Sequence, residues 1–316
     1  MKAIVSEGYG PPDRWQLRER DEPEIGDDGV LVRVRAASVN PYDWHLMRGR
    51  PYVLRLSEGL RRPKKEVPGI DLAGRVEAVG KDVTRFAPGD EVFGGRAGAL
   101  AEYVAGIEEK LAPKPPTLSF EQAAALPIAG VTALQGLRDK ASLQPGQQVL
   151  INGAAGGVGT FAVQIAKALG ADVTGVCSTR NLDLVTSIGA DRVVDYTRED
   201  FTRNGRRYDV ILDAVGNRSL SDLRRAITPD GAVVLAGGDS LPRLLAAFLL
   251  SRFAGRRWLR PFVANVNGED LLVLKELVDA GHVTPVIDRT YPLSEAAEAI
   301  RYLETRHARG KVVVTV

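Results

Sequence analysis

The sequence predicts an α/β protein in which an open, doubly wound parallel sheet is inserted into a mostly β domain. From Leu118 onward, short apolar runs alternate with segments of helical periodicity, which is typical of a parallel sheet covered by helices. Before Leu118, β-branched runs and turn signals such as Pro88-Gly89-Asp90 indicate a compact β domain. The β domain is therefore expected at residues 1–118 and 264–316, and the parallel sheet at 119–263.

Each expected element has its own pattern in the sequence. The chain's last apolar run follows a predicted helix and is expected to return to the first domain. Ser119 and Gln122 have the spacing of a capping box at a helix start. The predicted strands are 30–36, 73–80, 91–93, 149–151, 173–176, 191–195, 210–213, 233–236, 262–266 and 311–316, and the predicted helices are 119–126, 131–140, 160–169, 181–187, 219–227, one from 270 and 294–304.

The segment 149–180 reads as strand, glycine-rich turn, helix and second strand, which is the arrangement that binds a dinucleotide. Gly156 lets the backbone approach a pyrophosphate, and Gly159 lets the helix pack closely on the strand. The helix N-terminus adds free N–H groups and a partial positive charge. The alternative is a glycine-rich turn that binds nothing. The residues expected to bind the cofactor here are Ala155, Gly156, Gly157, Val158 and Gly159.

The end of the second predicted strand indicates which dinucleotide binds. NAD sites place an acidic residue about 20 residues after the glycines, but this chain has Cys177 there. Ser178, Thr179 and Arg180 follow, and an arginine with two hydroxyls suits a ribose 2′-phosphate. The sequence therefore predicts NADPH, the alternative for Arg180 being a solvated surface charge.

Composition limits the function further. The 316 residues are 44% hydrophobic and 26% charged, and a net charge of +2 gives no reason to expect nucleic acid. The longest apolar stretch, 244–250, is too short to span a bilayer, so no integral membrane segment is expected. The single cysteine excludes an internal disulfide and a multi-cysteine zinc site. With no signal-peptide pattern at the N-terminus, these features predict a cytoplasmic protein.

The chain resembles the medium-chain dehydrogenase/reductase superfamily, in its zinc-free quinone oxidoreductase branch. That resemblance implies a Rossmann nucleotide-binding domain inserted into a GroES-like catalytic domain. It covers essentially the whole length. The segments that carry it, in the family's order, are 37–43, 67–74, 86–92, 101–104, the glycine turn, 189–191 and 310–312.

Departures from the zinc-dependent relatives are equally informative. Those relatives carry a catalytic cysteine where this chain has Asn40, and His-Glu where it has Ile70-Asp71. Catalytic zinc needs three protein ligands, and no comparable set is present. The resemblance therefore implies metal-free, NADPH-dependent reduction of quinones or α,β-unsaturated carbonyl compounds, which are small-molecule substrates.

The resemblance also implies roles for single residues. Asn40 is expected to face the nicotinamide, although it could be a turn residue bonding its own backbone before Pro41. Tyr42 and His45 are candidate proton donors, with a packed or exposed histidine as the alternative for His45, and Asp43 is expected to cap the following helix. The resemblance also places Thr132, Tyr196 and Lys311 at the cofactor, the alternatives being an ordinary aromatic covering a strand end for Tyr196 and a solvated lysine for Lys311. Val215, Gly237 and Gly238 are expected there too, because the ligand crevice of such a sheet lies at its strand ends.

An apolar face flanked by arginines in segment 240–258 has several interpretations: a substrate lid, a dimer contact, a membrane-surface helix or a core helix. The strand predicted at 262–266 could pair across a two-fold axis, which predicts a homodimer. Two other functions remain open at this point. One is a trans-acting enoyl-thioester reductase, and the other is a catalytically silent NADPH-binding protein.

Overall fold

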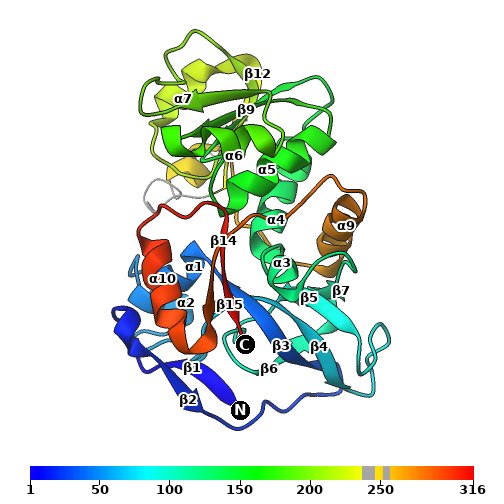
Figure 1. Ribbon diagram of the computed structural model, residues 1–316. Coiled ribbons are helices and arrows are strands. Elements are labelled where there is room, and N and C mark those ends of the chain that lie inside the picture. The colour runs from blue at the N-terminus through cyan, green and yellow to red at the C-terminus, as the bar shows by residue number, and fades with distance from the viewer. Residues whose placement is uncertain (237–245, 252–256) are drawn as a thin grey trace. The chain divides into compact units, whose positions relative to one another are not determined.

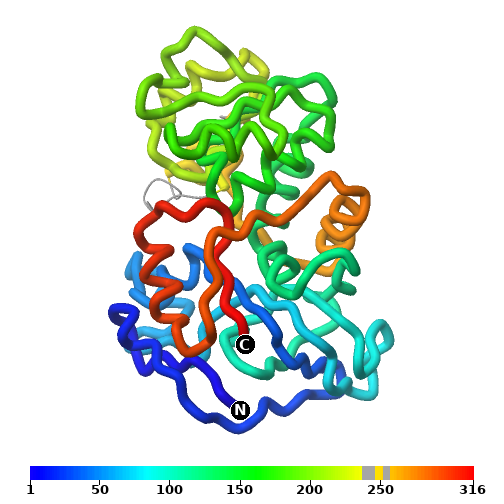
Figure 2. Tube along the Cα trace, in the orientation of Figure 1, coloured from blue at the N-terminus to red at the C-terminus, as the bar shows by residue number. Residues whose placement is uncertain are grey.

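In the computed structural model the chain forms two compact units, which are described one at a time (Figure 1). The structure describes residues 1–236, 246–251 and 257–316. Unit 1 comprises Met1–Ile128, Val266–Asp279 and Pro285–Val316, and unit 2 comprises Ala129–Asn265 and Ala280–Thr284. Both ends of the chain, marked N and C in Figure 2, therefore belong to unit 1.

Unit 1 is built on a seven-stranded sheet of the described residues, in the order β14-β15-β3-β4-β5-β7, with β6 also paired to β3. β1 and β2 form a separate antiparallel pair. The strands are β1 (Lys2–Ser6), β2 (Trp15–Glu19), β3 (Gly29–Val39), β4 (Asp71–Val79), β5 (Glu91–Gly95), β6 (Tyr103–Ile107), β7 (Leu111–Pro113), β14 (Ile287–Pro292) and β15 (Lys311–Thr315).

The long strand β3 lies at the centre of this sheet and fixes the polar residues at one of its ends. Ser38 lies opposite Asp71, the first residue of β4. Val39 lies opposite Val312, so Lys311, the first residue of β15, comes to the same end of the sheet. Three strands distant in sequence thus bring their polar ends together.

Two helices of unit 1 begin with a capping box. Ser119 and Gln122 form the expected capping box at α3. Asn40 and Asp43 form a second box at α1, which confirms the capping role expected for Asp43. The helices are α1 (Pro41–Arg48), α2 (Leu54–Glu58), α3 (Phe120–Ala124), α4 (Pro127–Leu134, shared with unit 2), α9 (Gly268–Asp279) and α10 (Ala296–Glu304), with single turns at Pro12–Arg14, Glu108–Lys110 and Leu293–Glu295.

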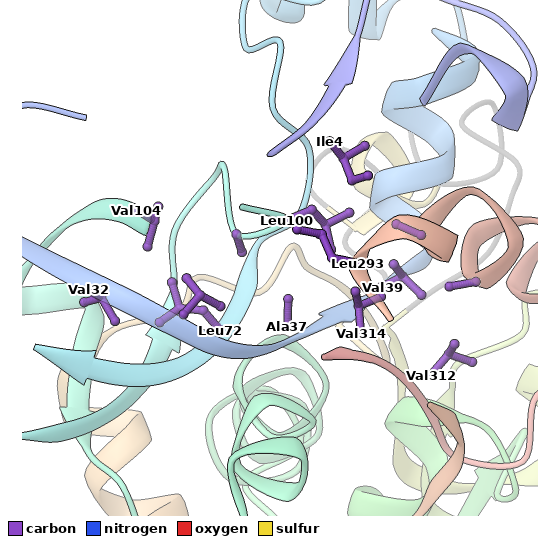
Figure 3. Packing of buried hydrophobic residues seen from close by; sticks show 14 of the residues in the cluster. Ile4, Val32, Ala37, Val39, Leu72, Leu100, Val104, Leu293, Val312 and Val314 are labelled. Carbon is purple, nitrogen blue, oxygen red and sulfur yellow. The ribbon is translucent and has the colours of Figure 1, made fainter. Parts of the chain in front are cut away.

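The hydrophobic core of unit 1 packs one face of the sheet against the flanking segments. Side chains from β1, β3, β4 and β15 meet there, among them Ile4, Val32, Leu72 and Val314 (Figure 3). Each of these four is at most 1% exposed. Burying each such side chain stabilises a fold by about 1.5–3 kcal/mol. The core therefore stabilises the sheet whose strand ends carry the polar residues.

Unit 2 contains a six-stranded parallel sheet of the described residues, in the order β10-β9-β8-β11-β12-β13. Numbered along the unit, this is the order 3-2-1-4-5-6 of a dinucleotide-binding sheet, which confirms the predicted fold class. The elements are β8 (Gln148–Asn152), α5 (Gly157–Ala168), β9 (Asp172–Cys177), α6 (Leu182–Ser187), β10 (Arg192–Asp195), β11 (Tyr208–Asp213), α7 (Leu220–Ala226), β12 (Ile227–Leu235) and β13 (Leu259–Pro261), with turns at Gln135–Lys140 and Thr179–Asn181.

Two predicted elements of unit 2 differ in the structure. The predicted helix 131–140 lies in α4 and in a π-helical continuation, Gln135–Lys140. The predicted strand 262–266 is wrong, because β13 ends at Pro261. Its apolar run is not a buried strand, since Val263 is 77% exposed.

The apolar segment 240–258 is described only in part. Residues 237–245 and 252–256, including Gly237 and Gly238, lie outside the described residues. Residues 246–251 are helical, and Phe248 and Leu249 of this helix are exposed. Among the described residues, no helix has the length and apolar character needed to cross a membrane.

Candidate active site

A buried carboxylate, Asp71, is the centre of the polar cluster in unit 1. It is 0% exposed and accepts four hydrogen bonds. The donors are Ser38 Oγ at 2.8 Å, Asn40 Nδ2 at 2.9 Å, Lys311 Nζ at 3.2 Å and the backbone N–H of Ile128 at 2.9 Å. A buried charge needs this degree of compensation, since water contributes nothing to it there.

Lys311 and Asn40 complete this cluster. The Lys311 ammonium donates to Asn40 Oδ1 at 2.6 Å as well as to Asp71. Lys311 is 3% exposed, so it is not a solvated lysine. Asn40 is 5% exposed. Its amide oxygen accepts from the Lys311 ammonium and its amide nitrogen donates to the Asp71 carboxylate, which fixes the orientation of the amide. Asn40 is thus more than a turn residue bonding its own backbone.

Asp43 is a second buried carboxyl, 1% exposed. Its Oδ2 accepts the backbone N–H of Asn40 at 2.7 Å. Burial raises the pKa of Asp43 to about 7; the negative charge of Asp71 adds to this rise, and the charge of Lys311 opposes it. A carboxyl with this pKa can gain or lose a proton near neutral pH.

A cavity of about 290 Å³ lies beside this cluster in unit 1. Tyr42 and Asp43 line it together with Ile70. Burial, and then the charge of Glu58, raise the pKa of Tyr42 to about 12. Tyr42 therefore keeps its proton at neutral pH, and its hydroxyl is hydrogen-bonded to Glu58, which lines the same cavity. The remaining lining residues are Leu46, Glu58, Lys65, Val67, Pro68, Gly69, Gly95, Arg96, Ala97 and Lys110.

His45 has different neighbours from those expected of a proton donor at this cavity. Its ring stacks on Trp44, with ring centroids 3.8 Å apart. Its Nδ1 lies 2.9 Å from the carbonyl oxygen of Arg50. His45 does not belong to the lining of the cavity. The structure thus brings Asn40, Tyr42 and Lys311 into one region of unit 1 and gives His45 other contacts.

The glycine turn of unit 2 leaves space in front of its backbone. Gly153, with φ +89°, makes the tight turn after β8, a role that the sequence reasoning did not assign to it. A Cβ on Gly159 would lie 2.0 Å from the Gly153 carbonyl oxygen, whereas a Cβ on Gly156 would have no atom nearer than 3.4 Å. Gly156 is the N-cap of α5 and offers no side chain to its free N–H groups. The turn therefore fits a pyrophosphate.

Next to this turn, β8 and β11 are neighbours where the strand order of the sheet reverses. Asn152 Nδ2 donates to Asp213 Oδ1 at 2.8 Å, and the same oxygen accepts the N–H groups of Val215 and Gly216. Val215 lies against the turn, since its Cγ2 is 2.6 Å from the Cβ position of Gly153. Sequence reasoning placed Val215 here but missed Asp213, which shapes the loop.

The end of β9 carries the residues predicted to select NADPH. Cys177 is buried, and burial, followed by the charge of Asp195, raises the pKa of its thiol to about 11. Arg180 is exposed in the turn that follows. Thr179 Oγ1 donates to Asp195, and this hydrogen bond lowers the pKa of Asp195. Sequence reasoning missed Asp195, because it belongs to the neighbouring strand.

Two of the other predicted cofactor residues, Tyr196 and Ser178, lie beside the end of β9, and a third, Thr132, lies in α4. Tyr196 is 49% exposed, and its N–H donates to the Cys177 carbonyl oxygen at 3.0 Å, so it lies beside the end of β9. Ser178 is the N-cap of the turn after β9. Thr132 is buried in α4.

Comparison with known proteins identifies related enzymes along the whole chain. Residues 188–314 match a family model described as zinc-binding dehydrogenase, and residues 26–116 match one described as alcohol dehydrogenase GroES-like domain. The chain is 37% identical to 2-methylene-furan-3-one reductase of Solanum lycopersicum, covering 99% of this chain and 79% of that protein.

Two further proteins show the same relationship. NADPH-dependent alkenal/one oxidoreductase of Arabidopsis thaliana is 37% identical, again over 99% of this chain and 79% of its own length. The solved quinone oxidoreductase of Coxiella burnetii has a TM-score of 0.86 and 34% identity, covering 100% of this chain and 99% of that one.

Proposed function

Since the chain belongs to the medium-chain dehydrogenase/reductase superfamily, in the branch of its quinone oxidoreductases and alkenal reductases, we propose that it is a zinc-independent, NADPH-dependent reductase. Its acceptors would be quinones or the C=C bond of α,β-unsaturated carbonyl compounds. The observation that carries this proposal is the buried cluster of Asn40, Asp71 and Lys311.

The donor set of this cluster does not fit a zinc ion. Catalytic zinc takes three ligands from Cys, His, Asp or Glu side chains, whereas the described residues supply only two near Asn40: Asp71, and Asp43 bonded to the Asn40 backbone. The Lys311 ammonium already neutralises the Asp71 carboxylate and would repel a dication. In the ranges that the structure describes, no group of three or more His, Cys, Asp or Glu side chains could hold a metal.

Residues of unit 2 support the choice of cofactor. The glycine turn has room for the pyrophosphate, and neutral Cys177 with Thr179 and Arg180 suits a 2′-phosphate better than a ribose hydroxyl. When bound, NADPH supplies the hydride. The residues proposed to hold it are Asn40, Thr132, Ala155, Gly156, Gly157, Val158, Gly159, Cys177, Ser178, Thr179, Arg180, Tyr196, Val215, Gly237, Gly238 and Lys311.

Without a metal, the chain itself must stabilise the charge that develops on the acceptor oxygen. A conjugated acceptor helps, because that charge spreads into an enolate or quinol. The Tyr42 hydroxyl keeps its proton and would exchange its hydrogen bond to Glu58 for one to the oxygen. Asp43 lines the same cavity with a pKa of about 7, so it can supply a proton. Lys311 and Asp71 hold Asn40 in one orientation.

An acceptor screen tests this proposal. We expect NADPH oxidation with a quinone and with a small enone, but not with saturated ketones or alcohols, and no loss of activity after treatment with EDTA. Tight NADPH binding without oxidation of any acceptor would instead identify a silent binding protein. Turnover confined to acyl-carrier thioesters would identify an enoyl-thioester reductase.

The proposal extends to a homodimer in the cytoplasm. Among the strands that the structure describes, β13 is the last in the order of the unit 2 sheet, so one of its edges can pair with a second copy. A single cysteine suits a reducing compartment. Sedimentation of the purified protein at twice the monomer mass would support the dimer, and a monomer mass would refute it.

A further inference from the structure

Residues 52–65 of unit 1 form a segment that exposes several apolar side chains close together. Leu56 lies in α2 (Figure 1) and is 72% exposed, and Leu60, which follows this helix, is 69% exposed. Tyr52 and Val53 are exposed just before α2. Within the described residues, no other stretch of nine residues exposes as many large apolar side chains. Such a concentration marks an interaction surface, whereas single exposed apolar side chains are common.

The same segment carries positive charge that the fold does not neutralise. Its exposed basic residues are Arg61, Arg62, Lys64 and Lys65. In the part of the chain that the structure describes, none of these four forms an ion pair with a carboxylate. The nearby acidic residues have other partners, since Glu58 is hydrogen-bonded to Tyr42 and Glu66 pairs with Arg20.

We propose that residues 52–65 dock the protein on an anionic membrane surface. Exposed leucines beside lysines and arginines are typical of segments that lie in the bilayer interface. The leucines enter the boundary of the acyl chains, and the cations contact anionic headgroups. A second copy of this chain is a poorer partner, because a symmetric contact through this segment would bring two groups of unneutralised cations together.

The docking segment 52–65 also borders the cavity beside Asn40. Glu58 and Lys65 belong to the segment and line that cavity, which has a volume of about 290 Å³. A protein docked through this segment would therefore hold the cavity next to the lipid, within reach of acceptors dissolved in the bilayer. This consequence rests on the proposed function, whereas docking itself does not.

Flotation of the whole protein with lipid vesicles tests the docking. We expect binding to vesicles of equimolar phosphatidylcholine and phosphatidylglycerol, and much weaker binding to vesicles of phosphatidylcholine alone. Raising the NaCl concentration from about 0.1 M to about 0.5 M should weaken the binding, because salt screens the headgroup charge. Absence of binding to the anionic vesicles, or equal binding to both kinds, would overturn the proposal.

The double variant Arg61→Gln, Arg62→Gln tests the charge. It should weaken binding to the anionic vesicles about tenfold or more, since two contacts with anionic lipid are lost. Arg206→Gln with Arg207→Gln is the matched control, because these are adjacent exposed arginines in unit 2. Equal binding by the Arg61, Arg62 variant and the parent would refute the proposal.

Leu56→Ser tests the apolar contact. It should weaken vesicle binding about tenfold, and Val263→Ser, which changes an apolar side chain that is 77% exposed, should not. If Leu56→Ser binds like the parent, charge alone acts and the partner is an acidic protein surface. If the parent sediments as a dimer and Leu56→Ser as a monomer, the segment joins two copies. Either result would overturn the proposal.

Kinetics separate the docking from the proposed reduction. With NADPH, the Arg61, Arg62 variant should reduce a short water-soluble enone as fast as the parent, because neither arginine lines the cavity. Its rate with a long-chain quinone dissolved in the anionic vesicles should fall. If the parent binds vesicles but reduces neither acceptor, the proposed function fails and the docking stands. If it reduces the enone without binding vesicles, the docking fails and the function stands.

Discussion

The polar centre of unit 1 and the carboxyl end of the unit 2 sheet are built in opposite ways. In unit 1, the Asp71 carboxylate and the Lys311 ammonium are buried and bonded to side chains from other strands. In unit 2, the turn around Gly156 presents backbone, and Arg180 and Tyr196 are exposed. The first arrangement depends on the fold, and the second depends mainly on local backbone conformation.

This difference predicts how each region responds to substitution. Loss of one charge in a buried cluster leaves its partner without compensation, so stability falls together with activity. Loss of an exposed side chain, or addition of a methyl group at an open glycine, changes ligand binding while the fold remains. Stability and binding should therefore be separable in unit 2 and coupled in unit 1.

Asp71→Asn should produce the largest effect. It leaves the buried Lys311 ammonium without a carboxylate, which costs about 3–5 kcal/mol of the free energy of unfolding. Urea denaturation measures this loss. Replacement of both partners, Asp71→Asn with Lys311→Met, should recover part of the loss. If the losses of stability of the single variants Asp71→Asn and Lys311→Met simply add in the double variant, the pair is not coupled and the contrast between the units fails.

Asp43→Asn should change how stability depends on pH. The pKa of Asp43 is about 7 in the folded protein and 3.8 as its ordinary value, so the folded state holds this proton more tightly. Its contribution to stability is complete below pH 3.8 and is lost as pH rises towards 7. Relative to Asp43→Asn, the parent should therefore lose stability across this window. Parallel curves of unfolding free energy against pH would contradict the raised pKa.

Gly156→Ala should separate binding from stability in unit 2. Gly156 has φ −86° and ψ 177°, which alanine adopts, and the added Cβ meets no atom nearer than 3.4 Å. The methyl group would occupy the space proposed for the pyrophosphate, so NADPH affinity should fall roughly 10–100-fold. The thermal midpoint should not change. Normal NADPH binding by this variant would remove Gly156 from the site.

Gly159→Ala is the matched control for this prediction. Its Cβ would lie 2.0 Å from the Gly153 carbonyl oxygen, so α5 must move away from the turn. Both the thermal midpoint and NADPH affinity should therefore fall. A loss in both quantities for Gly156→Ala as well would show that the two glycines have the same structural role.

Arg180→Ala should change cofactor preference by a smaller factor. Loss of its charge should weaken NADPH about tenfold and leave NADH unchanged, because only NADPH carries the 2′-phosphate. Asp195→Asn should instead strengthen NADPH binding. The Asp195 carboxylate is bonded to Thr179, so the substitution removes a negative charge beside the proposed 2′-phosphate. Fluorescence titration with both cofactors measures these changes. Equal effects of Arg180→Ala on the two would refute the 2′-phosphate assignment.

The same contrast between the two regions separates what the sequence could predict from what it could not. The glycine turn and the strands around it form one continuous segment, so periodicity and glycine spacing identified them. The cluster around Asp71 joins residues 33 and 240 positions away, through strand register that no local pattern records. The resemblance identified Asn40 and Lys311, but the bonds that hold them required the structure.

His45→Phe should produce the smallest effect. Histidine is a common proton donor in enzymes, but the sequence could not show that the ring of His45 stacks on Trp44. Phenylalanine preserves that stacking, so kcat should not change. Tyr42→Phe removes a hydroxyl group that lines the cavity beside Asn40 and should lower kcat about 10²-fold. If His45→Phe lowers kcat as far as Tyr42→Phe, the proton comes from His45 and the catalytic part of unit 1 extends beyond the buried cluster.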